Sequence, residues 1–375
     1  MKAIINSHLI LPQEILQEHV ILFEDTIKAI IPREKFQPAQ VTKLYDAQGH
    51  YLAPGFINMH IHGCAGFDAM DSAPDSVEKI AAALPATGVT AFLPTTMTCP
   101  WPEVATALGN IRAAQGKKTG ARILGANLEG PFISKAKTGA QDPANIKKAD
   151  FTLLEPFADI IKITTIAPET LPDFSFIKSC LEHAIIVSLG HSAATYEEAM
   201  DAILAGATHM THLFNAMVPL HHHGPGIVGA ALDTPVMCEL ICDNIHVHPM
   251  LQRLVYAAKD PANIVLITDS MRACLLGDGV SELGGQKVFV KNGKATLADG
   301  SLAGSTLTLN KAVANFRANT GAPLEEVINM VTLNPAEELG LENKLGSLTV
   351  GKLADLVELD ENMQVIKTWI NGEQK

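Results

Sequence analysis

The sequence is poor in aromatic residues, which make up 5% of its 375 positions, and only 18% of its residues are charged. Hydrophobic residues make up 47%, so the chain lacks the composition of a disordered protein and can bury a large core. No uninterrupted apolar run approaches the roughly 18 to 20 residues that a membrane-spanning helix needs. The N-terminus also lacks the basic stretch, apolar core and small-residue cleavage site of a signal peptide. We therefore expect a globular protein with no membrane partner.

Closely spaced cysteines are missing as well. The six cysteines are scattered along the chain, and no two of them form a C-x-x-C pair. Disulfide frameworks belong mainly to small secreted domains, which this chain is too long to resemble. The composition therefore predicts reduced, mostly buried thiols in a cytoplasmic protein.

Positive charge is scarce, because 28 Lys and Arg residues face 40 Asp and Glu residues and the formal net charge is -12. A surface this negative repels nucleic acid and anionic lipid, so neither is expected as a partner. An anionic small molecule would need a local cationic site, such as a metal. The chain also has no G-x-S-x-G nucleophile elbow and no G-x-x-x-x-G-K-[S/T] phosphate loop.

The pattern of apolar residues divides the chain into two parts. Residues 1–52 and 345–375 contain only short strand-like segments, and neither piece buries a core alone, so we expect them to form one small β-sandwich domain. Residues 53–344 alternate apolar strand-like runs with amphipathic helical stretches, in which apolar residues recur at spacings of three and four. The strand-like runs lie at 52–59, 89–96, 121–128, 159–167, 184–190, 207–213, 236–243 and 263–269.

Eight alternating units predict an α/β fold of the (β/α)₈ TIM-barrel type. A doubly wound open sheet is the alternative, but that fold more often has a glycine-rich phosphate turn after its first strand. The first strand here ends in HIHG instead. Residues 281–304 are predicted to form a hairpin after the eighth strand, with Asn292 and Gly293 as its turn.

Polar side chains of the kinds that bind metals follow many of the predicted strands. Alternate residues of a strand point to the same side, so His60 and His62 present two imidazoles to one point, as a divalent metal requires. In a barrel the carboxyl ends of all strands meet on one face, where active sites lie. The same face would receive the side chains at the ends of five further strands, which are Glu129, His191, His212, His246 and Asp269.

Each of these residues also has an ordinary structural interpretation. Taken singly, His191 and His212 fit hydrogen-bonded core residues, and Glu129 fits an exposed loop residue. Their common position at the ends of barrel strands favours a metal site. His209 lies three residues before His212 and, within a strand, would point to the other face, so we expect a structural role for it. A run of three histidines at 221–223 follows a strand end and is interpreted as a substrate or interface loop.

Asp269 follows an apolar strand and is the candidate catalytic carboxylate. A carboxylate at that position often caps a helix, but Ser270 is available for that task. In metal hydrolases a carboxylate beside the metal takes a proton from the bound water and gives it to the leaving group. Because an amide anion is a very poor leaving group, the nitrogen of an amide substrate needs that proton.

Six short motifs together resemble the N-acetylglucosamine-6-phosphate deacetylase family of the amidohydrolase superfamily. They are HIHG at 60–63, LEGPF at 128–132, GHSAAT at 190–195, HLFNAM at 212–217, ITDSM at 267–271 and LAGSTL at 302–307. The likeness covers essentially the whole chain. N-acetylgalactosamine-6-phosphate deacetylases share most of these motifs and are the near alternative.

The resemblance implies hydrolysis of the acetamide of N-acetyl-D-glucosamine 6-phosphate by a metal-bound hydroxide. It implies Glu129, His191 and His212 as the core metal ligands, and His60 and His62 as the ligands of a second ion, so that two divalent metals, zinc or iron, are expected. It implies Asp269 as general acid and base. It further implies contacts to the substrate from Ala140, Gln141, Asn215, Ala216, His223, His246, Leu302, Ala303 and Gly304.

Two positions differ from many members of this family. Gln141 stands where some members have a histidine, and His223 stands where many have an arginine that binds phosphate from the neighbouring subunit of a homodimer. Arginine forms a forked contact to phosphate that histidine does not reproduce, so His222, His223 and Arg272 are the candidate phosphate ligands.

Three other functions are considered. One is deacetylation of an unphosphorylated amino sugar. Another is a different amidohydrolase reaction, on a cyclic amide or an N-acetylamino acid, with Lys162 of the fourth strand as a carboxylated metal ligand. The third is a catalytically inactive metal or sugar sensor, which would not need to keep Asp269.

Overall fold

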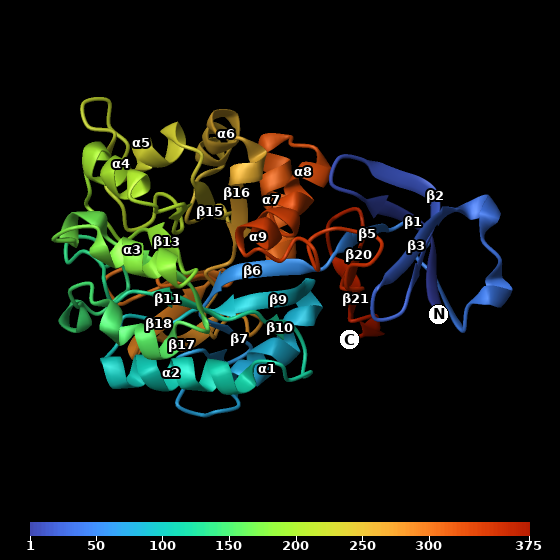
Figure 1. The fold of residues 1–375 in the computed structure, drawn as a ribbon, viewed down its shortest axis with the longest axis horizontal. Coiled ribbons are helices and arrows are strands. Elements are labelled where there is room, and N and C mark those ends of the chain that lie inside the picture. The colour runs from blue at the N-terminus through green and yellow to red at the C-terminus, as the bar shows by residue number, and fades with distance from the viewer.

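Strands from both ends of the chain form one mixed sheet at one end of the molecule (Figure 1). The computed structural model describes all of residues 1–375. The strand order is β22-β21-β20-β5-β1-β2-β3, with β4 paired to β1, and β5 joins the N-terminal strands to β20 of the C-terminal segment. The strands are β1 (Lys2–Ile10), β2 (Ile15–Phe23), β3 (Ile27–Pro32), β4 (Lys43–Asp46), β5 (Tyr51–Pro54), β20 (Leu356–Leu359), β21 (Val365–Ile370) and β22 (Glu373–Gln374).

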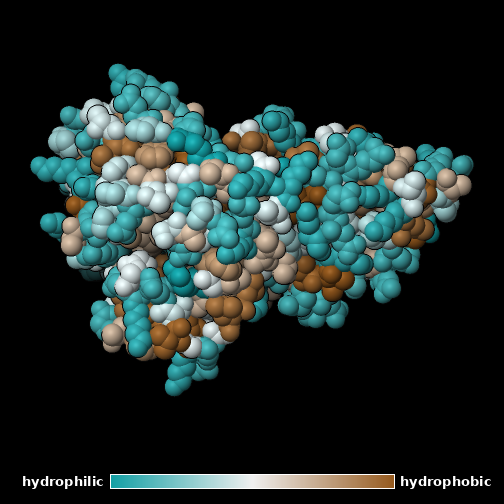
Figure 2. Space-filling view, turned by 90° about the horizontal axis from the view of Figure 1, so that it is seen from below, coloured by the Kyte–Doolittle hydropathy of each residue, from teal (hydrophilic) through white to brown (hydrophobic).

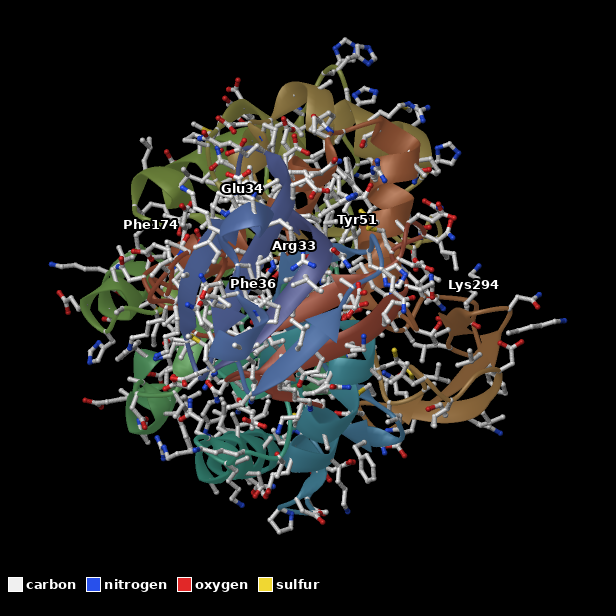
Figure 3. All side chains as sticks on the ribbon, turned by 90° about the vertical axis from the view of Figure 1, so that its right-hand side faces the viewer. Arg33, Glu34, Phe36, Tyr51, Phe174 and Lys294 are labelled. Atoms are coloured by element: carbon white, nitrogen blue, oxygen red, sulfur yellow. The ribbon has the colours of Figure 1, made fainter.

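The small sheet carries its own apolar clusters. The larger cluster surrounds Trp369, whose ring meets Tyr45 edge-on at 5.3 Å between centroids and Phe23 at 6.4 Å. A smaller cluster includes Phe36, which lies beneath the guanidinium of Arg33 at the outer end of the molecule (Figure 3). Because Trp369 comes from the C-terminal segment and the other two rings from the N-terminal one, this cluster ties the two ends of the chain together.

Eight parallel strands form the second part of the molecule and close into a barrel. Their order follows the sequence, and β6 and β9 form one ladder while β11 to β16 form another. Parallel bridges from Thr95 to Asn127 and from Ile61 to Ser270 connect the two ladders and complete the ring. The strands are β6 (Phe56–Ile61), β9 (Val89–Pro94), β11 (Ala126–Glu129), β12 (Ile161–Ile166), β13 (Ile186–Leu189), β14 (His209–Met210), β15 (Met237–Ile241) and β16 (Ile264–Ile267).

Helices connect and surround these strands. They are α1 (Ser76–Ala83), α2 (Trp101–Ala114), α3 (Ser175–Glu182), α4 (Tyr196–Leu204), α5 (Gly226–Asp233), α6 (Pro249–Ala258), α7 (Leu309–Thr320), α8 (Leu324–Asn329) and α9 (Leu333–Glu338). Local sequence sets several of their ends. Thr195 and Glu198 form a capping box at the start of α4, and α7 ends at Gly321, whose left-handed φ of 73° stops the helix. None of the helices combines the length and apolar composition needed to cross a bilayer.

The helices and strands of the barrel enclose a core of 83 buried hydrophobic residues. All six cysteines are buried and unpaired. On the face seen from below Figure 1, apolar residues form separate patches among polar ones (Figure 2). The apolar burial therefore lies among the barrel strands and the helices packed around them, and the polar ends of the strands form the site.

Two differences and one agreement concern the predicted segments. The sixth strand is shorter than predicted, because the chain leaves extended geometry at His212, whose φ is 27°. The amphipathic helical stretch at 75–88, predicted after the first strand, forms α1 and continues past it only as a 3₁₀ turn at Leu84–Thr87. The predicted hairpin forms, with β17 (Gly279–Leu283), β18 (Gln286–Lys291) and β19 (Lys294–Thr296), and Asn292 and Gly293 make its turn with φ values of 52° and 74°. A two-residue ladder, β7 (Gly63–Cys64) with β8 (Phe67–Asp68), follows the first barrel strand, and β10 (Arg122–Ile123) pairs with β9.

Truncating Trp369 tests the link between the chain ends. Trp369→Ala should lower the free energy of unfolding by about 3–5 kcal/mol, because it leaves a cavity where the rings from both segments meet. Urea unfolding followed by circular dichroism measures this. Ile366→Thr on the same strand is the control, and its exposed side chain should change stability by less than about 0.5 kcal/mol. A loss below about 1 kcal/mol for Trp369→Ala would show that the cluster does not hold the ends together.

Candidate active site

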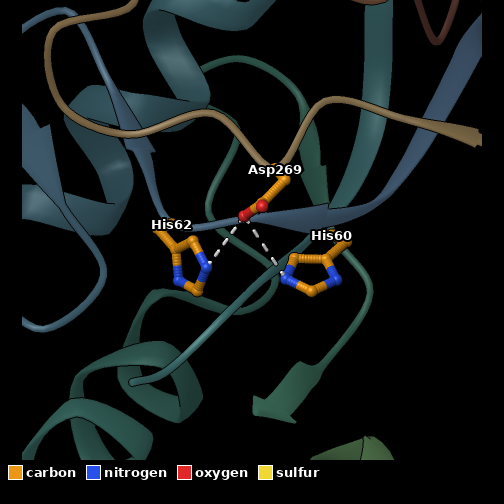
Figure 4. Close-up of side chains that lie close together, drawn as sticks. All are labelled: His60, His62 and Asp269. Atoms are coloured by element: carbon orange, nitrogen blue, oxygen red, sulfur yellow. Dashed lines mark ion pairs between the residues drawn. The ribbon is translucent and has the colours of Figure 1, made fainter. Parts of the chain in front are cut away.

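Four histidines and two acids from five different strand ends lie together at the carboxyl end of the barrel. They form two groups of three, in each of which the ligand atoms all lie within 4.8 Å of one another. One group is His60, His62 and Asp269, drawn in Figure 4, where the Asp269 carboxylate faces both imidazoles. The other is Glu129, His191 and His212. Residues separated by more than 200 positions in the sequence thus meet at one point, as predicted from the strand ends.

The carboxylate of Glu129 lies between the two groups. Its Oε1 atom is 2.9 Å from Nε2 of His212 and 3.2 Å from Nε2 of His191. The same oxygen is 3.5 Å from Nε2 of His60, and Oε2 is 3.4 Å from Nε2 of His62. The amide of Gln141 donates to Oε2 at 2.6 Å. A single carboxylate therefore touches all four imidazoles, and each oxygen faces a different set of partners.

The four imidazoles all direct Nε2 toward this carboxylate, and the opposite ring nitrogen is held from behind in three of them. Nδ1 of His62 lies 3.2 Å from the carbonyl of Thr95, and Nδ1 of His191 lies 2.9 Å from the carbonyl of Lys137. Nδ1 of His60 lies 3.0 Å from a buried carboxylate oxygen of Glu239. In a neutral ring these contacts place the single proton on Nδ1 and leave the Nε2 lone pair free for a ligand.

Unusual backbone geometry turns several of these side chains into the pocket. His191, His212, Ala216 and Asp269 have φ values of 48°, 27°, 50° and 48°, in the left-handed region that residues with a Cβ rarely adopt. Such positions cost about 1–3 kcal/mol each and persist where the surroundings hold them. His191, His212 and Asp269 each lie two residues past the end of a barrel strand, and the sharp turn lets each side chain face the cavity.

The buried charges change one another's protonation. Burial alone would raise the pKa of Glu129, but the imidazoles of His60 and His191 hold it well below its usual value. Burial alone would lower the pKa of His62, but hydrogen bonds to Asp269 and Glu129 raise it well above 6.5. Burial also opposes ionisation of Asp269, yet its bond to His62 lowers the pKa. In the metal-free site both carboxylates are therefore ionised and His62 carries a proton at neutral pH.

The donor set fits divalent metal ions. Nε2 of His60 is fully buried and has no hydrogen-bond partner, although two carboxylates lie 3.5 and 3.6 Å away. Nε2 atoms of His191 and His212 are only 3.1 Å apart, and both face the same oxygen of Glu129. Unpartnered imidazole nitrogens around carboxylates are the ligands of zinc and related metals. Each group of three could hold one ion, and Glu129 lies close enough to both to bridge them.

A cavity of about 240 Å³ opens beside these ligands. His246 lies in its wall, and Nδ1 of that ring is held 2.7 Å from the carboxylate of Asp243. Burial alone would raise the pKa of Asp243, but the hydrogen bond with His246 outweighs burial and holds the pKa below its usual value, so Asp243 stays ionised. The remaining wall residues include Met97, Gly139, Ala140, Gln141, Asn215, Ala216, Leu283, Ser301, Leu302 and Gly304.

The turn that contains Leu302 and Gly304 is attached to the catalytic candidate. The main-chain N–H of Ser305 donates to the carbonyl of Asp269 at 2.8 Å. A Cβ at Gly304 would lie 3.1 Å from that carbonyl and 3.2 Å from the side chain of Met271, and φ is 59° there. Only glycine lets this turn approach Asp269 so closely without strain.

The sequence around this site matches a known enzyme family. A model of the amidohydrolase family matches residues 51–375, which include the whole barrel and every residue of both metal groups. This chain belongs to the amidohydrolase family. It is a metal-dependent amide hydrolase with a TIM barrel and a small additional domain, as expected from the sequence.

Several relatives of this amidohydrolase are similar over nearly their whole length. N-acetylglucosamine-6-phosphate deacetylase of Bacillus subtilis (strain 168) is 42% identical over 330 residues, which cover 86% of this chain and 83% of that protein. N-acetylgalactosamine-6-phosphate deacetylase of Escherichia coli O157:H7 is 37% identical over 365 residues, with 96% and 95% covered. The crystal structure of N-acetylglucosamine-6-phosphate deacetylase from Pasteurella multocida matches with a TM-score of 0.94 at 33% identity and covers 100% of this chain and 99% of that one.

Most of the predicted site residues lie in or beside the cavity, but Ala303, Arg272 and the loop histidines His222 and His223 do not. Ala303 is fully buried and is not part of the cavity wall, although its neighbours Leu302 and Gly304 are. His223 lies on an exposed loop, where its ring lies 4.0 Å from that of His222, and it does not line the cavity of its own chain. Arg272, a candidate phosphate ligand, instead pairs with Asp71 at 2.9 Å in a separate cavity.

The position of Lys162 argues against a carboxylated lysine. Its Nζ donates to the carbonyl of Asp159, outside the cavity, so the side chain points away from the metal groups. His209 belongs to neither metal group; it is fully buried, and its two ring nitrogens lie 3.3 Å from Glu239 and 3.2 Å from Glu338.

Sequence reasoning missed two carboxylates that hold site histidines. Glu239 lies in the middle of the apolar strand β15, and a charge inside such a run was a visible sign of a buried partner. Asp243 follows the same strand and looked like an ordinary loop residue. The wall residues Met97, Leu283 and Ser301 carried no chemical signal at all.

The electrostatics predict that metal binding releases protons. His62 is protonated in the metal-free site at pH 7 because its pKa is raised, and it must lose that proton to bind a metal through Nε2. Calorimetric titration with zinc at pH 7, in two buffers of different ionisation enthalpy, should show release of about one proton or more per chain. His50→Gln, in the small sheet, is the control and should release the same number. Zinc binding without proton release would contradict the assigned charge state.

Proposed function

We propose that this amidohydrolase removes the acetyl group from N-acetyl-D-glucosamine 6-phosphate and yields D-glucosamine 6-phosphate and acetate. The observation that carries the proposal is the Glu129 carboxylate between two histidine groups, with Asp269 at the edge of the same cavity. That arrangement suits hydrolysis of an amide, and the relatives that match this chain over most of their length are named as deacetylases of amino sugar 6-phosphates.

We propose that two divalent ions, zinc or iron, occupy the two groups and share Glu129. His60, His62 and Asp269 would hold one ion, and Glu129, His191 and His212 the other. When bound, such ions polarise the amide carbonyl and lower the pKa of a water molecule enough for it to attack at neutral pH. The proposal rests on the number of donor residues, because four imidazoles and two carboxylates exceed the four ligands that one tetrahedral ion needs.

Asp269 would transfer the proton. It is ionised in the site, so its carboxylate can accept a proton from the attacking water and then give it to the amide nitrogen as the C–N bond breaks. Its main chain is tied to the Leu302–Gly304 turn, and its Oδ1 lies 3.1 Å from Nε2 of His62. Both contacts restrict the carboxylate to the side of the metal groups.

The rest of the cavity wall would orient the substrate. Nδ1 of His246 is engaged by Asp243, so Nε2 faces the cavity and, when it carries a proton, would donate a hydrogen bond to the acetyl carbonyl oxygen. Asn215 and the main chain of Ala216 would bind the sugar and its phosphate, and the side chains of Ala140, Gln141 and Leu302 would enclose the ring. The acetyl methyl group would lie against the apolar wall of Met97 and Leu283.

We propose a cytoplasmic homodimer in which His223 of one subunit reaches the phosphate bound by the other. Two observations support this proposal: the loop at residues 221–223 is exposed, and no arginine lines the cavity. Arg272 is no longer a candidate, since it is paired with Asp71 in the other cavity.

Acetate release from three substrates tests the function. N-acetylglucosamine 6-phosphate should have the highest specificity constant, about 10-fold to 100-fold above N-acetylglucosamine, because a charged hydrogen bond contributes about 1.5–3 kcal/mol. If a histidine holds the phosphate, the Michaelis constant for the phosphorylated substrate should rise from pH 6 to pH 8 and that for the free sugar should not. Equal specificity constants for both sugars would indicate a deacetylase of unphosphorylated amino sugars.

N-acetylgalactosamine 6-phosphate is the third substrate and the main alternative. The relative from Escherichia coli O157:H7, named as its deacetylase, is covered by this chain over 95% of its length. A higher specificity constant for this sugar than for the gluco epimer would replace the proposed substrate and leave the reaction unchanged.

Asp269→Asn tests the proton transfer. Asparagine keeps a side-chain oxygen toward the metal groups, so the variant should retain metal and substrate binding, while turnover falls by a factor of about 10² to 10⁴ because the amide neither accepts nor donates that proton. Steady-state acetate release measures turnover, and elemental analysis verifies the metal content. Asp71→Asn, which changes an aspartate outside the cavity, is the control and should stay near the wild-type rate. Turnover within a factor of about three for Asp269→Asn would remove this carboxylate from the mechanism.

A further inference from the structure

Glu239 lies beneath the metal groups and belongs to neither of them. It comes from the middle of β15 and is 1% exposed. Its Oε2 atom lies 3.0 Å from Nδ1 of His60 and accepts the main-chain N–H of His212 at 2.9 Å. One oxygen therefore contacts a residue of each metal group, through the side chain in one and through the main chain in the other.

Among the four imidazoles only His60 is supported by a carboxylate. His62 and His191 contact main-chain carbonyls, and Nδ1 of His212 is buried without a partner. With Nδ1 of His60 bonded to Glu239, Nε2 keeps its lone pair, and this nitrogen too is buried without a hydrogen-bond partner. The position of Glu239 Oε2 thus determines both the tautomer of His60 and the direction of its ring.

Two further residues hold Glu239 in place. Its Oε1 atom is 3.3 Å from Nε2 of His209, and Nδ1 of His209 is 3.2 Å from the carboxylate of Glu338 at the end of α9. An isolated buried carboxylate is very costly, whereas one that contacts two imidazoles and an amide is compensated. The row His60, Glu239, His209, Glu338 runs from the metal groups through the barrel interior to a helix.

We propose that Glu239, supported by His209 and Glu338, is the positioning residue for His60 and sets the affinity of the ion held by His60, His62 and Asp269. This inference rests on the proposed occupancy of both groups. Its effect on the ion at Glu129, His191 and His212 is smaller, because there Glu239 contacts only the main chain of His212. What matters is the place of an acceptor atom, and the negative charge is secondary.

Two substitutions separate position from charge. Glu239→Gln keeps an oxygen at the place of Oε2 and turns its NH₂ group toward His209, so it preserves the acceptor and removes the charge. Glu239→Asp keeps the charge but withdraws the acceptor by one methylene group. In competition with a chelator, Glu239→Asp should weaken the ion at His60, His62 and Asp269 by about 10-fold to 100-fold, and Glu239→Gln should stay closer to wild type.

Glu358 offers a matched control. It is also a buried glutamate in the middle of a strand, and it contacts Nδ1 of His50 at 2.8 Å, but it belongs to the small sheet. Glu358→Asp should leave both metal affinities unchanged. If Glu239→Gln weakens the ion more than Glu239→Asp does, or if Glu239→Asp weakens both ions equally, Glu239 acts by charge or by general packing and the proposal is wrong.

Magnetic resonance supplies a readout that does not depend on the number of ions. In zinc-loaded protein with ¹⁵N-labelled histidine, the Nδ1–H signal of His60, identified by its loss in His60→Asn, should persist in Glu239→Gln and disappear or shift in Glu239→Asp. A wild-type protein that binds one ion only would overturn the two-ion proposal. The positioning inference would still be decided by this signal, and an unchanged signal in Glu239→Asp would sink it.

Discussion

The rest of the site depends on the placement of one buried carboxylate among four imidazoles. Glu129 touches the Nε2 atoms of His60, His62, His191 and His212, which come from the ends of three strands. A charge this deep in a protein is stable only when opposite charge or strong donors surround it. The barrel provides such surroundings because all eight strands end on one face, so its closure and its chemistry have the same geometric origin.

The energetic cost of this arrangement is offset below the site and beside it. Left-handed turns at His191, His212 and Asp269 are strained, and the buried imidazoles need fixed partners. The carboxylate of Glu239 accepts the main-chain N–H of His212, and the N–H of Ser305 donates to the carbonyl of Asp269, so two of these positions are held by hydrogen bonds. The polar interior of this barrel is therefore a support for the metal groups, and the apolar contacts that stabilise the fold lie mainly between the strands and the helices.

The net negative charge of the chain affects how an anionic substrate would be bound. A chain with a net charge of -12 does not attract an anionic sugar phosphate over long distances. Metal ions in the cavity would supply the missing positive charge where the amide is cleaved. No arginine lines the cavity to receive a phosphate, and the exposed histidines at 221–223 are the residues through which a second subunit would contribute.

The sequence by itself determined the class of fold and which side chains gather at the candidate metal site. Periodic apolar runs show the strands, and His60, His62, Glu129, His191, His212 and Asp269 each follow such a run, so a barrel had to bring them together. Only the tertiary structure decided what holds them. Glu239 contacts His60 from 179 positions away in the sequence, and Asp243 contacts His246 from three positions away. Arg272 is paired with Asp71, and His223 lies outside the cavity of its own chain. A strand pattern specifies which face a side chain lies on, but the partner of a buried charge depends on which elements pack against it, and that is set by the closed barrel as a whole.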